Sequence, residues 1–262
     1  MSNIYKAFEN KKAFIAFLTA GDPDFETSVE CFKAIARAGA DLIEVGIPFS
    51  DPIAEGPVIQ EADLRALSSG MTTDKVFELV REVRKETDVP MVFMSYINPI
   101  YHYGADEFFK KAAEVGIDGA IVPDMPYEEK GELDSTAAKY GIDIISMIAP
   151  TSEDRIKMIA KEAKGFIYVV SSLGVTGVRT EIKTDLGSML SNIREVTDVP
   201  AAIGFGISTP EQAKKMAAVA DGAIVGSAMV RIVAAEGKNA PEKLYEYVKS
   251  MKEAIDVFKI EF

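Results

Sequence analysis

Short apolar runs alternate along the chain with longer segments in which apolar residues recur every three or four positions. The short runs have the length and composition of buried strands, and the longer segments have the period of amphipathic helices. Segments such as ETSVECFKAIARAGA and EDRIKMIAKEA show the helical pattern. We expect strands at residues 13–20, 41–47, 90–96, 119–124, 143–149, 165–171, 200–206 and 222–226.

The order of these elements predicts the fold class. A strand followed by a helix, repeated along the chain, builds a parallel α/β sheet because parallel neighbours need helical crossovers. Eight such units favour a closed (β/α)8 TIM barrel, and 262 residues suit its usual size of about 250. The pattern AGADLIEVG recurs as VGIDGAIVP and VADGAIVG, and no linker-like tract interrupts the chain. We therefore expect residues 1–262 to form a single barrel domain with a short N-terminal helix. Thr73 and Ser152 are expected to cap two of the helices.

The composition limits the partners that the chain can have. With 48% hydrophobic and 27% charged residues, it is typical of a soluble globular enzyme. Its formal net charge of −12 disfavours a broad attraction to nucleic acid or to anionic membranes. Any anion that it binds must therefore be held by a local arrangement of donors. No segment has the apolar length of a membrane span or of a signal peptide, which predicts a cytoplasmic protein.

The chain has few residues that bind transition metals through sulfur or imidazole. A single histidine and a single cysteine cannot make a zinc site of the usual nitrogen and sulfur type, and they exclude an internal disulfide. The sequence therefore predicts no metal site. The methionines, including Met91, Met94, Met147 and Met158, are interpreted as core filling.

One predicted strand carries a carboxylate where a buried strand normally carries none. Residues 43–57 read IEVGIPFSDPIAEGP, so Glu44 interrupts an aliphatic run and Glu55 follows on the loop. Alternation along the strand puts Glu44 on the face opposite Ile43 and Val45, which suit the helix layer. Glu44 then points into the barrel near the carboxyl end of the strand, where active sites lie and where burial raises a carboxyl pKa. The alternative is a structural carboxylate paired with a buried arginine or lysine.

Glycine-rich turns follow three consecutive predicted strands. They read SSLGVTG (171–177), GFGIST (204–209) and VGSA (225–228). Glycine lets the backbone approach a ligand closely, and the N–H groups that begin the following helices attract anions. The loops after strands seven and eight of such barrels often bind phosphate. The sequence therefore predicts a phosphate site here, with ordinary βα turns as the alternative.

The segments EVGIPFSDPIAEGPVIQEADLRAL, SSLGVTG, GFGIS and VGSA, in this order and spacing, resemble the tryptophan synthase α subunit family. The resemblance runs from FLTAGDPD through YINP and VPDMP to GSA, which is essentially the whole chain. It implies a (β/α)8 barrel that cleaves indole-3-glycerol phosphate to indole and glyceraldehyde 3-phosphate. It also implies a pyridoxal-phosphate (PLP) β subunit as partner, in an α2β2 heterotetramer, to which the indole passes. The α chain itself is then expected to hold no cofactor.

The resemblance also implies roles for individual residues. Glu44 matches the acid that protonates the indole ring carbon, Glu55 the carboxylate at the ring N–H, and Tyr168 a tyrosine near the reacting groups. The residues that match the phosphate cradle are Gly177, Gly206, Gly226 and Ser227. Those that match the indole pocket are Phe17, Tyr96, Ile121, Ile148 and Phe205. Those that match loop closure and signalling to the partner are Asp51, Asp124 and Thr176.

The implied reaction needs neither a lysine imine nor a metal ion, and the sequence predicts neither in the barrel. Carbon–carbon cleavage by a retro-aldol step needs a place for an electron pair, which lysine imines and divalent metals commonly supply. No lysine lies within the predicted strands, and the histidine supply disfavours a metal. Protonation of the indole ring by Glu44 would create an iminium-like acceptor, and loss of the side-chain hydroxyl proton would then drive cleavage.

Glu55 departs from the family pattern, which ordinarily has aspartate before this Gly-Pro pair. The charge is kept and one methylene is added, although a shift of about 1 Å at a reacting group can reduce a rate on the order of 100-fold. Three alternatives follow for the function. The chain could be a stand-alone lyase that releases indole, a catalytically weak α subunit that mainly activates the β subunit, or a phosphosugar isomerase on a similar barrel.

Overall fold

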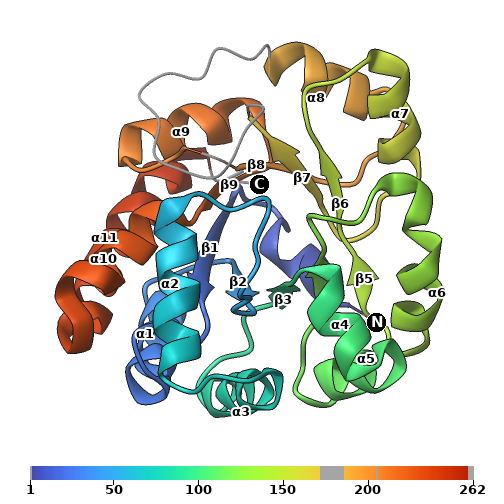
Figure 1. The fold of residues 1–262 in the computed structure, drawn as a ribbon. Coiled ribbons are helices and arrows are strands. Elements are labelled where there is room, and N and C mark those ends of the chain that lie inside the picture. The colour runs from blue at the N-terminus through green and yellow to red at the C-terminus, as the bar shows by residue number, and fades with distance from the viewer. Residues whose placement is uncertain (1, 172–185, 205, 259–262) are drawn as a thin grey trace.

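Parallel strands form a barrel at the centre of the molecule, and helices surround it (Figure 1). The computed structural model describes residues 2–171, 186–204 and 206–258. In sheet order the strands are β5 (Asp143–Ile144), β4 (Gly119–Ile121), β3 (Met91–Met94), β2 (Leu42–Gly46), β1 (Ala13–Thr19), β9 (Gly222–Val225), β8 (Ala201–Gly204), β7 (Ile167–Val170) and β6 (Ser146–Ile148). The paired neighbours run parallel, as crossover helices require.

The two ends of the sheet meet in one short stretch of chain. Only Ile145 separates β5 from β6, so the strand predicted at 143–149 is present but divided. Its first half pairs with β4 and its second half with β7, because the segment changes partner at Ile145. This stretch therefore nearly closes the barrel, and the predicted (β/α)8 architecture is confirmed.

The helices follow the strands in the predicted alternation. Their bounds are α1 (Phe25–Arg37), α2 (Pro57–Ser68), α3 (Thr73–Arg84), α4 (Ile97–Tyr103), α5 (Ala105–Glu114), α6 (Gly131–Lys139), α7 (Glu153–Lys161), α8 (Leu186–Arg194), α9 (Pro210–Val219), α10 (Ser227–Glu236) and α11 (Ala240–Ile255). Among the described residues, 3-10 helices lie at Ile4–Ala7, Tyr127–Glu129, Gly237–Asn239 and Asp256–Phe258. Within the described ranges, no helix has the length and apolarity to cross a membrane.

Two predicted helix caps have different outcomes. Ser152 caps α7, since its side chain accepts a hydrogen bond from the backbone N–H of Arg155. The prediction for Thr73 is wrong, because Thr73 is already the first residue of α3. Thr72 has the extended backbone that a cap needs, and its hydroxyl accepts from the N–H of Lys75.

The core has two layers that follow the alternation of side chains along each strand. Ile15, Leu42 and Val92 pack inside the barrel. Ile43 and Val45 belong to the larger layer between the strands and the helices. The orientation predicted for the strand that carries Glu44 is therefore confirmed. Each fully buried aliphatic side chain contributes about 1.5–3 kcal/mol to folding.

The N-terminal 3-10 helix packs against the interior of the barrel. Ile4 is 1% exposed and joins the interior cluster together with Phe166. The ring of Phe8 lies 5.9 Å from the ring of Phe166. Asn3 fixes this turn by donating from its backbone N–H and its side-chain amide to Asp118, at 2.8 and 3.1 Å. The short N-terminal helix is thus part of the barrel core.

The repeated pattern in the sequence has a structural counterpart at the same end. Asp41, Asp118 and Asp221 occupy equivalent positions just before β2, β4 and β9. Each carboxylate accepts a backbone N–H at the start of the neighbouring strand, β1, β3 or β8, at 2.8, 3.2 and 3.0 Å. A charged acceptor roughly doubles the strength of such a hydrogen bond. The repeat therefore fixes pairs of strands to each other.

Asp41 gives a test of this arrangement, because its carboxylate also lies 2.7 Å from Lys11 and from Lys252 of α11. Its side chain is 5% exposed. We expect Asp41→Ala to lower the free energy of unfolding by about 3 kcal/mol, since it leaves buried donors unpaired. Urea denaturation measures this. Glu82→Ala, which removes an exposed pair with Lys85, is the control and should change little. Equal effects of the two variants would contradict the role of Asp41.

Candidate active site

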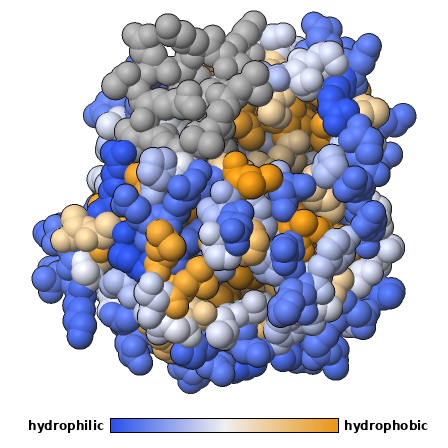
Figure 2. Space-filling view, viewed as in Figure 1, coloured by the Kyte–Doolittle hydropathy of each residue, from blue (hydrophilic) through white to orange (hydrophobic). Residues whose placement is uncertain are grey.

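A main cavity lies among the carboxyl ends of the strands, where barrel enzymes carry their active sites. Glu44, Glu55 and Tyr168 give it polar groups, and Gly206, Gly226 and Ser227 line its other side. On the face drawn in Figure 2, hydrophilic residues cover the helices, and hydrophobic residues gather in hollows near the middle. With Phe17, the structure therefore brings together seven of the site residues that the sequence singled out.

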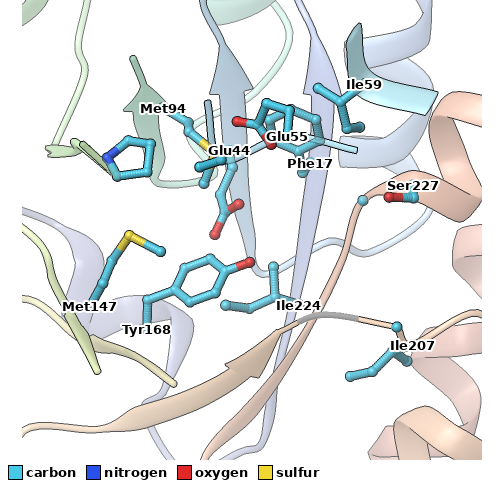
Figure 3. A pocket seen from close by; sticks show the side chains of 14 residues that line it. Phe17, Glu44, Glu55, Ile59, Met94, Met147, Tyr168, Ile207, Ile224 and Ser227 are labelled. Atoms are coloured by element: carbon cyan, nitrogen blue, oxygen red, sulfur yellow. The ribbon is translucent and has the colours of Figure 1, made fainter. Parts of the chain in front are cut away.

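Glu44 projects from β2 into the main cavity and is 1% exposed. In Figure 3 its carboxyl group and the hydroxyl of Tyr168 point toward one another. Neither carboxyl oxygen has a hydrogen-bond partner among the described residues, and no lysine or arginine of that part of the chain pairs with it. The alternative of a structural ion pair thus has no support in the described structure.

Burial raises the pKa of Glu44 to about 8, and the negative charge of Glu55 adds to the rise. An ionised carboxylate loses its hydration in this position and gains no cation in return. At neutral pH the carboxyl group is therefore mostly protonated. A neutral acid facing a cavity is suited to proton donation.

Glu55 lies on the loop between β2 and α2 and is 6% exposed. The loop is held in place around it. The side-chain amide of Gln60 donates to the backbone carbonyl of Glu55 at 2.8 Å, and the backbone N–H of Ala54 donates to the hydroxyl of Tyr96 at 2.8 Å. Pro57 then begins α2, a position where its missing N–H has no consequence. The second carboxyl group is thus fixed beside the first.

Tyr168 projects from β7 and is 5% exposed. Burial raises the pKa of its hydroxyl well above the usual value, and the charges of Glu44 and Glu55 raise it further. The phenol therefore stays neutral. A Cβ atom on Gly204 of β8 would overlap the phenol, which explains why glycine occupies that position.

The apolar wall of the main cavity agrees with the prediction in part. Phe17 lines it as expected, together with Met94 and Met147. Ile148 does not line it, so that prediction is wrong. Ile148 faces the outer layer between the strands and the helices. Successive side chains point to opposite faces, so a shift of one residue along β6 exchanges Met147 for Ile148.

Two other predicted pocket residues lie next to the main cavity without lining it. Ile121 is fully buried inside the barrel, in the same interior cluster as Tyr168, so its placement in the pocket wall is corrected. Tyr96 lines a separate inner cavity, which also touches Glu55 and Asp63 of α2 and has a volume of about 10 Å³. This inner cavity is close to the space that one water molecule needs.

Glycines and the start of a helix form the side of the main cavity opposite the carboxyl groups. Gly206 has a φ of 85°, which a residue with a side chain rarely adopts. Gly226 precedes α10 and Ser227 begins it, so free backbone N–H groups of this helix adjoin the cavity. A Cβ on Gly226 would lie 3.2 Å from the ring of Phe17. Three further predicted residues, Thr176, Gly177 and Phe205, lie outside the described residues.

The two aspartates predicted to act in loop closure lie outside the main cavity. Asp51 is exposed and accepts a hydrogen bond from the hydroxyl of Ser50 at 2.5 Å. Asp124 is partly buried, and its carboxylate accepts from the backbone N–H of Ile97 at 2.9 Å. It thereby joins the loop after β4 to the start of α4.

The sequence prediction differs from the structure at four residues, for reasons that are visible in the pattern. Met94 and Met147 are predicted to fill the core, but they point inward from the end of β3 and the middle of β6 and line the main cavity. Met158 is 41% exposed and fills no core. Asp63 lies on the buried face of α2, and helical spacing from Ile59 would have placed it there.

Burial raises the pKa of Asp63 to about 8, with the charge of Glu55 as the next cause. The neighbourhood of Glu55 therefore contains three buried carboxyl groups. Among the residues that the structure describes, no group of three histidine, cysteine or acidic side chains is arranged to hold a metal ion.

Comparison with known proteins gives a consistent result over the full length. A family model described as tryptophan synthase alpha chain matches residues 5–256. The tryptophan synthase alpha chain of Lacticaseibacillus casei is 51% identical over 259 residues, which is 99% of this chain and 97% of the relative.

Solved structures agree with the sequence relatives. The tryptophan synthase subunit alpha of Legionella pneumophila is 37% identical, with a TM-score of 0.88 over 98% of this chain and 99% of that chain. A chain in a structure on the mutual activation of the tryptophan synthase a2b2 complex from Pyrococcus furiosus is 36% identical, with a TM-score of 0.84 over 93% and 99%. These matches confirm the resemblance carried by the sequence motifs, and the chain belongs to the tryptophan synthase alpha chain family.

Proposed function

We propose that the chain cleaves indole-3-glycerol phosphate to indole and glyceraldehyde 3-phosphate by general acid–base chemistry, without a metal ion or a cofactor of its own. The observation that carries this proposal is Glu44, a carboxyl group with no cationic partner among the described residues, buried at the mouth of the barrel. The reaction belongs in the cytoplasm, in keeping with a chain that has a single cysteine.

The two carboxyl groups have different tasks: Glu44 transfers protons, and Glu55 stabilises charge. Glu44, neutral at the start, gives its proton to the ring carbon that bears the glycerol chain, and the ring becomes a cation. Glu55, as a carboxylate near the ring N–H, stabilises that positive charge. The hydroxyl proton of the chain then returns to Glu44, the carbon–carbon bond breaks, and its electron pair restores the indole ring. Glu44 ends the cycle protonated, so no outside proton is consumed.

The remaining residues hold the substrate. Phe17, Met94 and Met147 supply an apolar wall suited to the flat indole ring. The backbone around Gly206 and Gly226 and the hydroxyl of Ser227 suit the phosphate group. The hydroxyl of Tyr168, a neutral phenol, points toward the Glu44 carboxyl group and would lie beside the reacting part of the substrate.

We further propose that the chain works with a PLP-dependent β subunit, to which it passes indole. The support is the Pyrococcus furiosus relative, which belongs to an a2b2 complex. Glu55 favours one alternative, in which a catalytically weak α subunit mainly activates its partner. A stand-alone lyase that releases indole is the other alternative, and turnover with and without the β subunit separates the two.

Removal of the proton donor tests the central residue. We expect Glu44→Gln to reduce kcat/KM for indole formation by about 1000-fold, because general acid catalysis contributes roughly 100- to 10,000-fold. Indole release from indole-3-glycerol phosphate measures this. Glu211→Gln, an exposed change on α9, is the control and should retain the wild-type rate. Equal rates for Glu44→Gln and the wild type would exclude Glu44 as the donor.

The pKa of Glu44 predicts the alkaline side of the pH profile. The acid acts only while protonated, and its pKa is raised to about 8. Activity should therefore be present below this pH and decline about tenfold per unit above it. The profile of kcat/KM against pH measures the decline. An alkaline limit near pH 5 would show that Glu44 is ionised in the free enzyme and is unsuited to the role.

Glu55→Asp separates the lyase from the weak activator. The loop around Glu55 is fixed by Gln60 and Tyr96, so a shorter side chain should draw the carboxylate back from the ring. We expect kcat to fall about 10- to 100-fold. A clear gain in indole formation would instead favour the activator, because it would mean that the added methylene impairs catalysis.

A further inference from the structure

A third carboxyl group lies close behind the proposed pair. Asp63 is 5% exposed and belongs to the face of α2 that packs on the barrel, with Ile59, Ala62 and Ala66. An aspartate on the apolar face of an amphipathic helix is unfavourable unless it is paired or neutral. In this position the Asp63 carboxyl group must therefore be either paired with a cation or protonated.

The inner cavity connects Asp63 to Glu55. Both side chains line it, together with Ser95 and Tyr96, and Glu55 also lines the main cavity. Glu55 thus lies between Glu44 on one side and Asp63 on the other. The backbone N–H of Phe49 and, less strongly, the hydroxyl of Thr19 oppose the rise of the Asp63 pKa, which burial and the charge of Glu55 outweigh. Thr19 Oγ1 is buried and has no hydrogen-bond partner among the described residues.

No lysine or arginine among the described residues forms an ion pair with Asp63. Arg65, two positions further along α2, donates from Nε and Nη2 to the two carboxylate oxygens of Asp22, at 2.7 and 2.8 Å. The titratable and charged groups around Asp63 are Glu55 from the loop, Tyr96 after β3 and the Asp22–Arg65 pair. Like charges in one buried space cannot all be ionised, so protons must be shared among the carboxyl groups.

We propose that Asp63 is a positioning residue that keeps its proton at neutral pH and, through the inner cavity, allows Glu55 to be the ionised carboxylate of the site. This inference rests on the proposed function for its kinetic part only. A neutral Asp63 can donate a hydrogen bond toward Glu55, directly or through one water molecule, and a donor favours the charged form of its acceptor. Burial and the charge of Glu55 raise the pKa of Asp63 to about 8, in agreement with this assignment.

The protonation of Asp63 can be measured without any turnover. The full chain is labelled with carbon-13 at the aspartate and glutamate carboxyl groups, and Asp63→Asn identifies the Asp63 signal by its loss. We expect this signal to stay at the position of a neutral acid through about pH 7 and to move with a midpoint near 8. Glu61→Gln, an exposed change on the same helix, should leave it unaltered. A midpoint below about pH 5 would overturn the proposal.

The acid side of the kinetic profile tests the link to Glu55. Asp63→Asn keeps an N–H donor and removes no charge if Asp63 is neutral, so the acid limit of kcat/KM should move by less than about 0.3 pH unit. Asp63→Leu removes the donor, so the limit should rise by about one unit and kcat should fall about tenfold with little change in KM. A downward shift of a unit or more in Asp63→Asn would mean that Asp63 was ionised, and would overturn the proposal.

The results that would overturn the proposed function and the role of Asp63 can be told apart. Absence of indole formation by the wild type, alone and with a β subunit, would overturn the proposed function. The NMR midpoint would still decide whether Asp63 is neutral. If Asp63→Leu does not fold, Asp63→Asn still carries the kinetic test, because the amide has the size of the carboxyl group.

Discussion

The site depends on the desolvation of one carboxyl group. Inside the barrel, Glu44 has aliphatic and aromatic neighbours and meets no cation among the described residues. An unpaired ionised group in such a place would cost several kcal/mol, so the neutral acid is the stable form. The same burial keeps Tyr168 a neutral phenol. A barrel interior that is dry enough to hold these groups neutral is therefore a condition for the proposed chemistry.

The charge in this region belongs to the group of carboxyls as a whole. Glu55 is the residue whose charge raises the pKa of both Glu44 and Asp63. Groups that interact this strongly titrate together, so a pH profile reports the set and not a single side chain. In the proposed arrangement, two neutral acids flank one carboxylate. Because Glu44 and Asp63 are neutral in this arrangement, neither adds a negative charge that would repel the carboxylate of Glu55.

Much of this arrangement could be predicted from the alternation of apolar and polar residues. The strands, the barrel and the inward direction of Glu44 all follow from a period of two residues along the strands and the crossovers between them. The predictions of single residues were wrong where a shift of one position along the chain changes which side chain faces the cavity or caps the helix. The sequence predicts Ile148 where the structure has Met147, and Thr73 where it has Thr72. Neither composition nor hydropathy fixes a register to one residue, because both members of each pair suit either place.

Asp63 shows a different limit of the sequence. Its helical spacing indicates burial, but nothing in the sequence places it behind Glu55, since that depends on how α2 packs on β1. Ile121 is similar. Its inward direction was predictable, whereas its depth beneath the cavity depends on where the strand ends. Depth along the barrel axis is set by tertiary packing, and pattern alone gives only the face.

The packing of the N-terminal turn bears on the chemistry at the opposite mouth. Ile4 and the contact between Phe8 and Phe166 close the amino-terminal end of the barrel. Asn3 holds this plug in place through its hydrogen bond to Asp118. The plug shields the interior from solvent on that side. Loosening it would admit water from below, bring hydration back to Glu44 and draw the acidity of that group toward an ordinary glutamic acid. The first turn of the chain thus keeps water away from the proposed proton donor at the far end of the barrel.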